Sequence, residues 1–343
     1  MARCCDGNPD SDHAEGRRAK AAVEGARSHV ARLIGADPGE IIFTSGGTEA
    51  DNMALLGVGG TPMISAVEHK AVLVPATDLD GRVLPVDSLG RLNLGEVEQA
   101  VRRHRPALVS VMQANNEIGN LYPVGRIARI AHGYGALCHT DAVNALGKIP
   151  VNVHALGVDL ASFSAHKIGG PKGVGALYVR AGLDLPALVR GGGQESGHRA
   201  GTPNVPGIVG FGAAAYSMWR FLRRDGSTLL GQHRDALERG VLRHVQGSQV
   251  VGNTRAGGRL PNTTTIAFAG VKPTDLVHAL DRLGVAASSG SACGCKNPGP
   301  SHVLKAIGCT GAVRFSCGPG TTHGAVRSAV GAISESVEGL RSR

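Results

Sequence analysis

The chain is poor in aromatic residues and lacks the patterns that mark several protein classes. Phe, Trp and Tyr make up only 3% of the 343 residues, so a hydrophobic core must depend mainly on Ala, Val, Leu and Ile. No run of 18 apolar residues is present, which argues against a membrane-spanning helix. The opening stretch MARCCDGNPDSDHAEG has no apolar core of a signal peptide, so we expect a cytoplasmic protein.

Charge of one sign is not concentrated anywhere in the chain. The 36 Lys and Arg residues outnumber the 27 Asp and Glu residues, but the two kinds are interleaved and no block of five basic residues occurs. The scarcity of aromatic side chains for base stacking also argues against direct nucleic-acid binding, so an anionic small ligand is the better interpretation. Seven cysteines without a regular spacing favour free thiols in a reducing compartment.

Strand-like apolar runs alternate with segments of helical length in the first two-thirds of the sequence. A helix is predicted from Glu15 to Leu33 by the period of its apolar residues, with Gly35 as a stop signal. The strand-like runs are EIIFTS, PMISAV, ALVSVM, ALCHTDAV, VDLASFS and GALYV. This alternation favours an α/β fold with a mostly parallel central sheet covered by helices.

The pattern changes near residue 225, where helix-like segments flank the strand-like run TTTIAFAG. We therefore expect a large ligand-binding domain over residues 1–224 and a smaller C-terminal α+β domain over residues 225–343. In parallel sheets ligands bind beyond the carboxyl ends of the strands, so the residues at those ends matter most.

The run EIIFTS is followed by Gly46-Gly47-Thr48 at an expected helix start. Glycine permits close approach of a phosphate to the free N–H groups of a helix N-terminus, but an ordinary turn would have the same residues. Thr48 and Asp51 also have the spacing of an N-terminal capping signature.

Two further strand ends carry ionisable residues. Asp141 ends one strand and could pair with a ring nitrogen or cap a turn, while Lys167 follows another and could form a Schiff base or lie in solvent. Ser164 and His166 beside this lysine could reach a phosphate. A phosphate cradle, a strand-end Asp and a strand-end Lys in this order predict a pyridoxal phosphate site.

Eight motifs occur in the order seen in one family: FTSGGTEADN, VEHKA, NNEIGNLYPV, HTDAVNALGK, SFSAHKIGGPKGVGALYVR, GGGQESGHRAGTPNV, SSGSAC and RFSCGPGTT. In these motifs the chain resembles cysteine desulfurases of the NifS/IscS type, which belong to the class V aminotransferase-like enzymes of pyridoxal phosphate fold type I. The resemblance extends from about Gly7 to the last helix.

The resemblance implies a role for each matching residue. Lys167 would hold the cofactor as a Schiff base and move the Cα proton, Asp141 would pair with the pyridinium nitrogen, and His69 would stack on the ring and assist proton transfer. The other implied cofactor contacts, to the phosphate and the phenolic oxygen, are made by Gly47, Thr48, Ser164, His166, Asn116 and Asn144.

The substrate would be bound by Arg314, whose planar guanidinium matches a carboxylate, together with Asn116 and Asn8. Thr202 of AGTPNV would reach the phosphate of the partner subunit, which implies a homodimer with shared active sites.

The run SSGSACGCKNPGP contains Cys293 and Cys295, whose spacing alone fits a metal clip, a disulfide, buried thiols or a reactive thiol. A metal clip needs more ligands, and only His302 is near in sequence, so no metal is expected. In the family that the chain resembles, the cysteine of SSGSAC is the nucleophile. Cys293 would take the sulfur of L-cysteine as a persulfide, release L-alanine and pass the sulfur to an acceptor protein or small molecule, for iron–sulfur clusters, tRNA thiolation or a metabolite.

The sequence also departs from the family pattern. The usual segment before Gly7-Asn8-Pro9 and the scaffold-docking tail are expected to be missing, Asn144 is shorter than the usual glutamine, Cys295 is an extra thiol, and Pro319 stands where arginine is common. Three alternatives stay open: a selenocysteine lyase, which shares the scaffold; an aminotransferase-like reaction that does not need Cys293; and, because of the missing segment, a truncated, non-catalytic dimeric relative.

Overall fold

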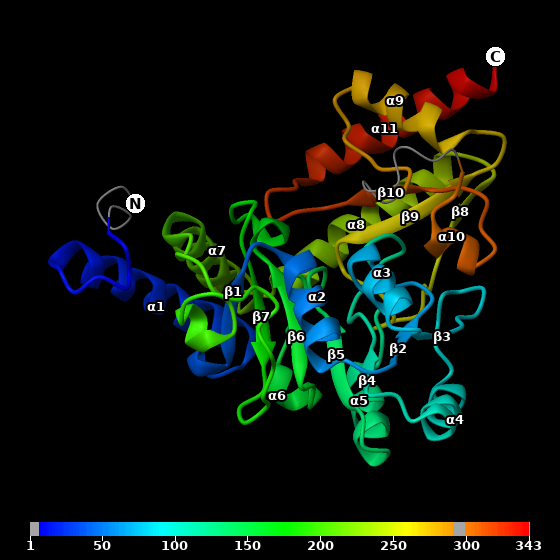
Figure 1. Ribbon diagram of the computed structural model, residues 1–343. Coiled ribbons are helices and arrows are strands. Elements are labelled where there is room, and N and C mark those ends of the chain that lie inside the picture. The colour runs from blue at the N-terminus through cyan, green and yellow to red at the C-terminus, as the bar shows by residue number, and fades with distance from the viewer. Residues whose placement is uncertain (1–6, 291–298, 343) are drawn as a thin grey trace. The chain divides into compact units, whose positions relative to one another are not determined.

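The computed structural model describes residues 7–290 and 299–342, and the chain divides into two compact units (Figure 1). The first unit comprises the residues up to Leu84, Leu94–Gln113 and Pro123–Arg224. The second comprises Pro85–Asn93, Ala114–Tyr122 and the residues from Asp225 onward. The two short segments of the second unit lie in the sequence within the expected large domain, so a single boundary at residue 225 does not describe this division.

The first unit contains a seven-stranded sheet in the order β1-β7-β6-β5-β4-β2-β3 (Figure 1). Strands β3, β2, β4, β5 and β6 are parallel to one another, whereas β7 is antiparallel to both of its neighbours, β6 and β1. The predicted mostly parallel sheet is therefore confirmed. The strands are β1 Ile41–Thr44, β2 Pro62–Ser65, β3 Arg82–Leu84, β4 Leu108–Ser110, β5 Leu137–Asp141, β6 Leu160–Ser164 and β7 Gly175–Val179.

The described helices of this unit are α1 Ala14–Ile34, α2 Gly47–Val58, α3 Lys70–Asp78, α4 Leu94–His104, α5 Val124–Gly133, α6 Val153–Leu156 and α7 Val205–Leu222, with short 3₁₀ segments η2 Pro38–Glu40, η3 Ala165–Ile168 and η4 Gln194–Gly197. Helix α1 ends as predicted, because Gly35 adopts a left-handed conformation (φ 66°) and its N–H bonds the carbonyl of Ala31. Helix α2 packs on the sheet, and its Met53 and Leu55 share a core with Ile42 and Leu177.

The predicted capping pair of Thr48 and Asp51 is wrong. Gly46 is the N-cap of α2 and contributes no side-chain bond, and Thr48 already lies in the first helical turn. The Asp51 side chain is instead buried, with 1% of its surface exposed.

The second unit contains a three-stranded antiparallel sheet, β10-β9-β8, and four described helices (Figure 1). The strands are β8 Ser248–Val250, β9 Thr263–Phe268 and β10 Val313–Ser316; the helices are α8 Gly226–His244, α9 Pro273–Arg282, α10 His302–Ala306 and α11 His323–Arg341. Buried residues such as Leu237, Ile266, Leu276, Phe315 and Ile333 form its core.

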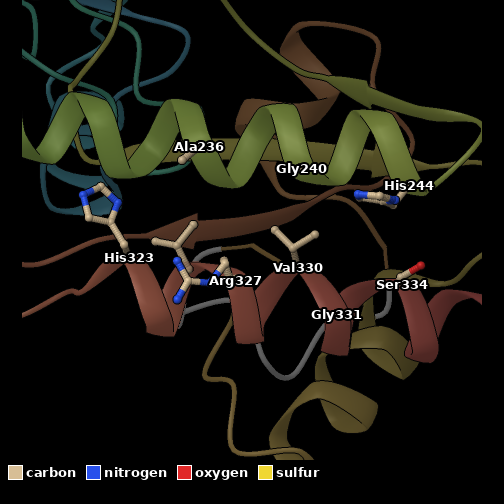
Figure 2. Close-up of a pocket in the computed structure, with 9 residues that line it drawn as sticks. Ala236, Gly240, His244, His323, Arg327, Val330, Gly331 and Ser334 are labelled. Carbon is tan, nitrogen blue, oxygen red and sulfur yellow. The ribbon is translucent and has the colours of Figure 1, made fainter.

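Helices α8 and α11 line a groove of about 650 Å³ (Figure 2). Val330 points toward α8 at Gly240, where a Cβ atom would lie only 2.7 Å from the Val330 side chain. Glycine at 240 therefore permits this close packing of the two helices. Within the described residues, no helix is long and apolar enough to cross a membrane.

Candidate active site

The strand order of the first unit gathers the predicted strand-end residues at one edge of the sheet. Gly175, at the start of β7, pairs with Thr44 of β1 on one side and with Ser164 of β6 on the other. Asp141 ends β5, which is the other neighbour of β6. Because β1, β5 and β6 run in the same direction, their carboxyl ends and the groups that follow them share this edge.

The N-terminus of α2 provides a place for an anion at this edge. A Cβ atom added to Gly47 would lie 2.7 Å from the Val143 side chain, and one added to Gly175 would lie 2.6 Å from the backbone of Gly46. Glycine therefore brings the first N–H groups of α2 close to the ends of β5 and β6. Free N–H groups at the start of a helix attract phosphate and other anions.

Ser164 and His166 lie at and just after the end of β6, and Ser164 is next to Gly47 at the start of α2. The Ser164 Oγ and the His166 Nδ1 are 2.8 Å apart, within hydrogen-bond distance. Burial and the charges of Lys167, Lys148 and Lys172 lower the pKa of His166. Burial is the larger cause, and the part that comes from the three lysines shows that positive charge gathers here, which suits an anionic ligand.

Asp141 lies buried at the end of β5, and its Oδ1 accepts a hydrogen bond from the Val143 N–H at 2.9 Å. Burial raises the pKa of Asp141, while the charges of His69 and Lys167 act in the opposite direction. The Asp141 carboxyl group therefore interacts electrostatically with both His69 and Lys167, two of the predicted catalytic residues.

Lys167 lies in η3, directly after β6, and its side chain is exposed. The half-buried Lys148 donates from Nζ to the carbonyl of Lys167 at 3.3 Å. Burial and the charge of Lys167 lower the pKa of Lys148 to about 7. Sequence reasoning missed Lys148, although it follows the Asp141 motif in HTDAVNALGK.

His69 is the N-cap of α3, where its Nδ1 accepts the N–H of Ala71 at 3.2 Å. The preceding residue, Glu68, is fully buried and accepts hydrogen bonds from the Ser65 hydroxyl and the Met112 N–H. Burial raises the pKa of Glu68 to about 8. The backbone bond of the imidazole fixes which of its nitrogens can face a ligand.

The predicted substrate-binding residues Arg314 and Asn116 lie in the second unit. Arg314 is on β10, and its guanidinium donates a hydrogen bond to the carbonyl of Asn116. Burial lowers the pKa of Arg314, and the charge of Glu117 opposes this shift. A half-buried guanidinium with one carbonyl partner keeps further N–H donors for a carboxylate.

Cys293 and Cys295 lie outside the described residues, but both flanks of their segment are held in the second unit. On one side, Ser288 exchanges two backbone hydrogen bonds with Arg314, at 2.7 and 3.1 Å. On the other, the Ser301 hydroxyl donates to Glu117 Oε2 at 2.5 Å. Sequence reasoning missed Glu117, which lies one residue after Asn116 and links this flank to the region of Arg314.

The loop that carries Thr202 is fixed in the first unit by two ion pairs. Arg27 binds Glu195 through two nitrogens, at 2.8 and 2.9 Å, and Arg199 binds Glu49 at 2.9 Å. Thr202 lines a cavity of about 160 Å³ near the end of β1. Both ion pairs join residues about 150 or more positions apart, so no sequence spacing could reveal them.

The structure gives only the local surroundings of the last two predicted site residues, Asn144 and Asn8. Asn144 lies in the turn that follows Asp141. Asn8 is exposed, and its side-chain oxygen accepts the N–H of Asp10 at 3.1 Å. Asp10 in turn accepts from Gln194, so this segment is linked to the Thr202 loop.

Comparison with known proteins gives consistent matches over nearly the whole chain. Residues 4–328 match the model of the aminotransferase class-V family. A cysteine desulfurase of Sinorhizobium fredii is 46% identical over 90% of this chain and 84% of its own length. The cysteine desulfurase IscS of Dictyoglomus turgidum is 42% identical over 98% and 88%. The solved structure of a NifS-like protein has a TM-score of 0.88 and 36% identity, and covers 97% of this chain and 92% of its own.

Proposed function

Because the chain belongs to the class-V aminotransferase family, and within it to the cysteine desulfurases of the NifS/IscS type, we propose that it is a pyridoxal phosphate-dependent cysteine desulfurase. The observation that carries the proposal is the sheet edge of the first unit. There the N-terminus of α2 follows β1, the buried Asp141 is the last residue of β5, and Lys167 follows β6.

These residues fit the chemical groups of pyridoxal phosphate. The phosphate would be held by the N–H groups of α2 with Thr48, Ser164 and His166, since cations and glycines surround that position. Asp141 would pair with the ring nitrogen, and Lys167 would hold the carbonyl carbon. His69 would cover the ring, and Asn116 and Asn144 would bond its phenolic oxygen.

When bound, pyridoxal phosphate supplies an electron sink that makes the Cα proton of an amino acid removable. The amine of Lys167 would take that proton and return it during the reaction. Arg314 would bind the substrate carboxylate and thereby fix the orientation of the Cα–H bond. Its remaining N–H donors make it suitable for a bidentate contact.

Cys293 would act as the nucleophile toward the sulfur of the substrate. Its thiolate attacks that sulfur, an S–S bond forms, and the C–S bond of the substrate breaks. The carbon skeleton leaves as L-alanine after gaining a proton, and Cys293 keeps the sulfur as a persulfide. The sulfur would then pass to an acceptor protein or small molecule, as in iron–sulfur cluster assembly.

We further propose a cytoplasmic homodimer in which Thr202 contacts the phosphate bound by the partner subunit. The resemblance of AGTPNV to the family motif and the anchoring of this loop by two ion pairs support the role of Thr202.

The proposal is tested by loading the protein with pyridoxal phosphate and measuring alanine release from L-cysteine under reducing conditions, with Cys293→Ser as the control. Alanine from the wild type and none from Cys293→Ser supports the assigned reaction. Equal release from both proteins would contradict the role of Cys293. A strong preference for selenocysteine would indicate a selenocysteine lyase, and a protein that cannot bind the cofactor would indicate a non-catalytic relative.

A further inference from the structure

Asp51 is a buried carboxyl group that the proposed reaction does not use. It lies on α2 with 1% of its surface exposed, and among the described residues its Oδ1 has no hydrogen-bond partner. An ionised carboxylate oxygen buried without a donor is strongly destabilising. The geometry therefore favours the neutral form of this side chain.

The nearest candidate for a counter-ion is His139, on β5. Its Nε2 lies 3.7 Å from Asp51 Oδ1, which is beyond hydrogen-bond distance, and it bonds the Ser162 Oγ at 3.0 Å instead. Its Nδ1 lies 2.8 Å from the Ser110 Oγ. Burial lowers the pKa of His139 to about 3, so the imidazole is neutral at pH 7.

The polar chain of Ser110, His139 and Ser162 leads from β4 across β5 and β6 to Asp51. If the imidazole donates from Nε2 to Ser162, the Ser162 hydroxyl is free to donate to the Asp51 carboxyl, with which it is hydrogen-bonded. Each member of the chain then has a partner without any of them carrying a charge.

The other ionisable groups around Asp51 are carboxyl groups as well. Burial is the main cause that raises the pKa of Asp51, the charges of Asp141 and Glu68 raise it further, and only the hydrogen bond of Ser162 acts in the opposite direction. Asp141 differs from Asp51 because it accepts a hydrogen bond from a backbone N–H, and because the charges of His69 and Lys167 act to lower its pKa. Of the two aspartates, Asp141 is therefore the better place for a negative charge.

We propose that Asp51 is a positioning residue that keeps a proton at neutral pH and so leaves the single negative charge of the two aspartates on Asp141. The consequence for catalysis rests on the proposed function: one full charge, on Asp141, would face the ring nitrogen of the cofactor. The proton on Asp51 is a property of the chain without cofactor and can be measured there.

The first experiment is infrared difference spectroscopy of the cofactor-free protein at pH 7, comparing wild type with D51N and with D141N. A protonated carboxyl group absorbs at higher frequency than a carboxylate. We expect D51N to lose a protonated-carboxyl band and D141N to lose carboxylate bands. Loss of carboxylate bands in D51N, or loss of the protonated band in D141N alone, would overturn the proposal.

A measurement on the wild type covers the case in which D51N does not fold. Labelling aspartate with ¹³C at the side-chain carboxyl should shift a protonated-carboxyl band of the native protein at pH 7. No shift of any such band would overturn the proposal, because no aspartate would then carry a proton. As a matched control, D159N should lose carboxylate bands, since buried Asp159 binds the Arg180 guanidinium at 2.8 Å.

A second readout uses the protein loaded with pyridoxal phosphate. Because Asn mimics a neutral Asp, the pH midpoint of the cofactor's absorbance change in D51N should coincide with that of the wild type. A displacement by more than about one pH unit would show that Asp51 is charged and would overturn the proposal. If the chain does not bind the cofactor at all, the proposed function fails while the infrared result still decides the state of Asp51.

Discussion

The ionisable side chains at the sheet edge of the first unit differ from those around Arg314 in the second unit in what sets their protonation. In the first unit, ionisable groups are buried at the sheet edge, and burial changes their protonation: it raises the pKa of Glu68 and Asp141 and lowers that of His139. In the second unit, the charge of Glu117 opposes the lowering of the Arg314 pKa, and both residues also hold the flanks of the segment that carries Cys293.

This difference fits the proposed roles of the two units, in which the first binds the cofactor and the second binds the substrate carboxylate and carries the nucleophile. A cofactor that gains and loses protons needs neighbouring groups of fixed protonation. Burial at the edge of the parallel sheet fixes the protonation of such groups. A substrate carboxylate and a thiol that must deliver sulfur need a fixed cation and well-anchored loop ends. Variants of the cofactor-contacting residues at the sheet edge should therefore change the spectrum of the bound cofactor, while variants of Arg314 and Glu117 should change turnover alone.

The largest effect is expected for Lys167→Ala. Loss of the amine removes both the covalent link to the cofactor and the proton acceptor, so alanine release should fall by about 10³-fold or more. Absorbance spectroscopy should show a changed cofactor band that no longer responds to borohydride. Lys20→Ala, at an exposed lysine of α1, should retain the wild-type rate and band; an equal loss there would contradict the role of Lys167.

Glu68→Gln should alter the pH dependence of stability. The folded-state pKa of about 8 lies above the ordinary glutamate pKa of 4.5, so the native protein binds this proton more tightly than the unfolded chain. Stability from this group is present below pH 4.5 and is lost as the pH rises to 8, by on the order of 5 kcal/mol.

Denaturant unfolding of the cofactor-free protein across this pH range measures the effect. The decline should be smaller in Glu68→Gln than in the wild type, while Glu98→Gln, at an exposed position on α4, should follow the wild type. Parallel pH profiles of wild type and Glu68→Gln would show that Glu68 is ionised in the folded protein.

Arg314→Lys should weaken substrate binding without changing the cofactor spectrum. Lysine keeps the positive charge but cannot form two parallel hydrogen bonds with a carboxylate, so kcat/KM for L-cysteine should fall about 10- to 100-fold. Steady-state kinetics at saturating cofactor would show this mainly as a higher KM. Arg327→Lys, on the exposed face of α11, is the control, and an equal fall in both variants would remove the special role of Arg314.

The smallest effect is expected for Glu117→Gln. The amide still accepts from Ser301, but the attraction to Arg314 is lost, so kcat should fall about three- to tenfold, corresponding to about 1 kcal/mol. The cofactor spectrum should stay unchanged. A changed spectrum would break the proposed separation between the two units, and Glu335→Gln, exposed on α11, serves as the control.

Residues that act through local sequence could be predicted well. The helix stop at Gly35, the strand that ends at Asp141 and the short segment with Lys167 after β6 all follow from apolar period and turn chemistry. The order of the strand ends then indicated one shared edge, because parallel strands terminate together.

Residues that act through tertiary contacts could not be predicted in this way. Asp51 has the spacing of a capping residue, and only the packing of α2 on the sheet shows that it is buried beside His139. The pairing of Arg199 with Glu49 joins the Thr202 loop to the distant helix α2, and Glu117 gains its role from Ser301. Segments 85–93 and 114–122 show no change of composition, so their place in the second unit was not visible either.

The most direct test of Cys293 as the nucleophile is a single turnover with L-cysteine labelled with heavy sulfur, followed by mass spectrometry of the peptide that contains Cys293. The heavy sulfur should appear on Cys293 in the same amount as the L-alanine released, and Cys293→Ser should give neither. Alanine release with the label on Cys295 or in free sulfide alone would contradict the assignment of Cys293 as the nucleophile.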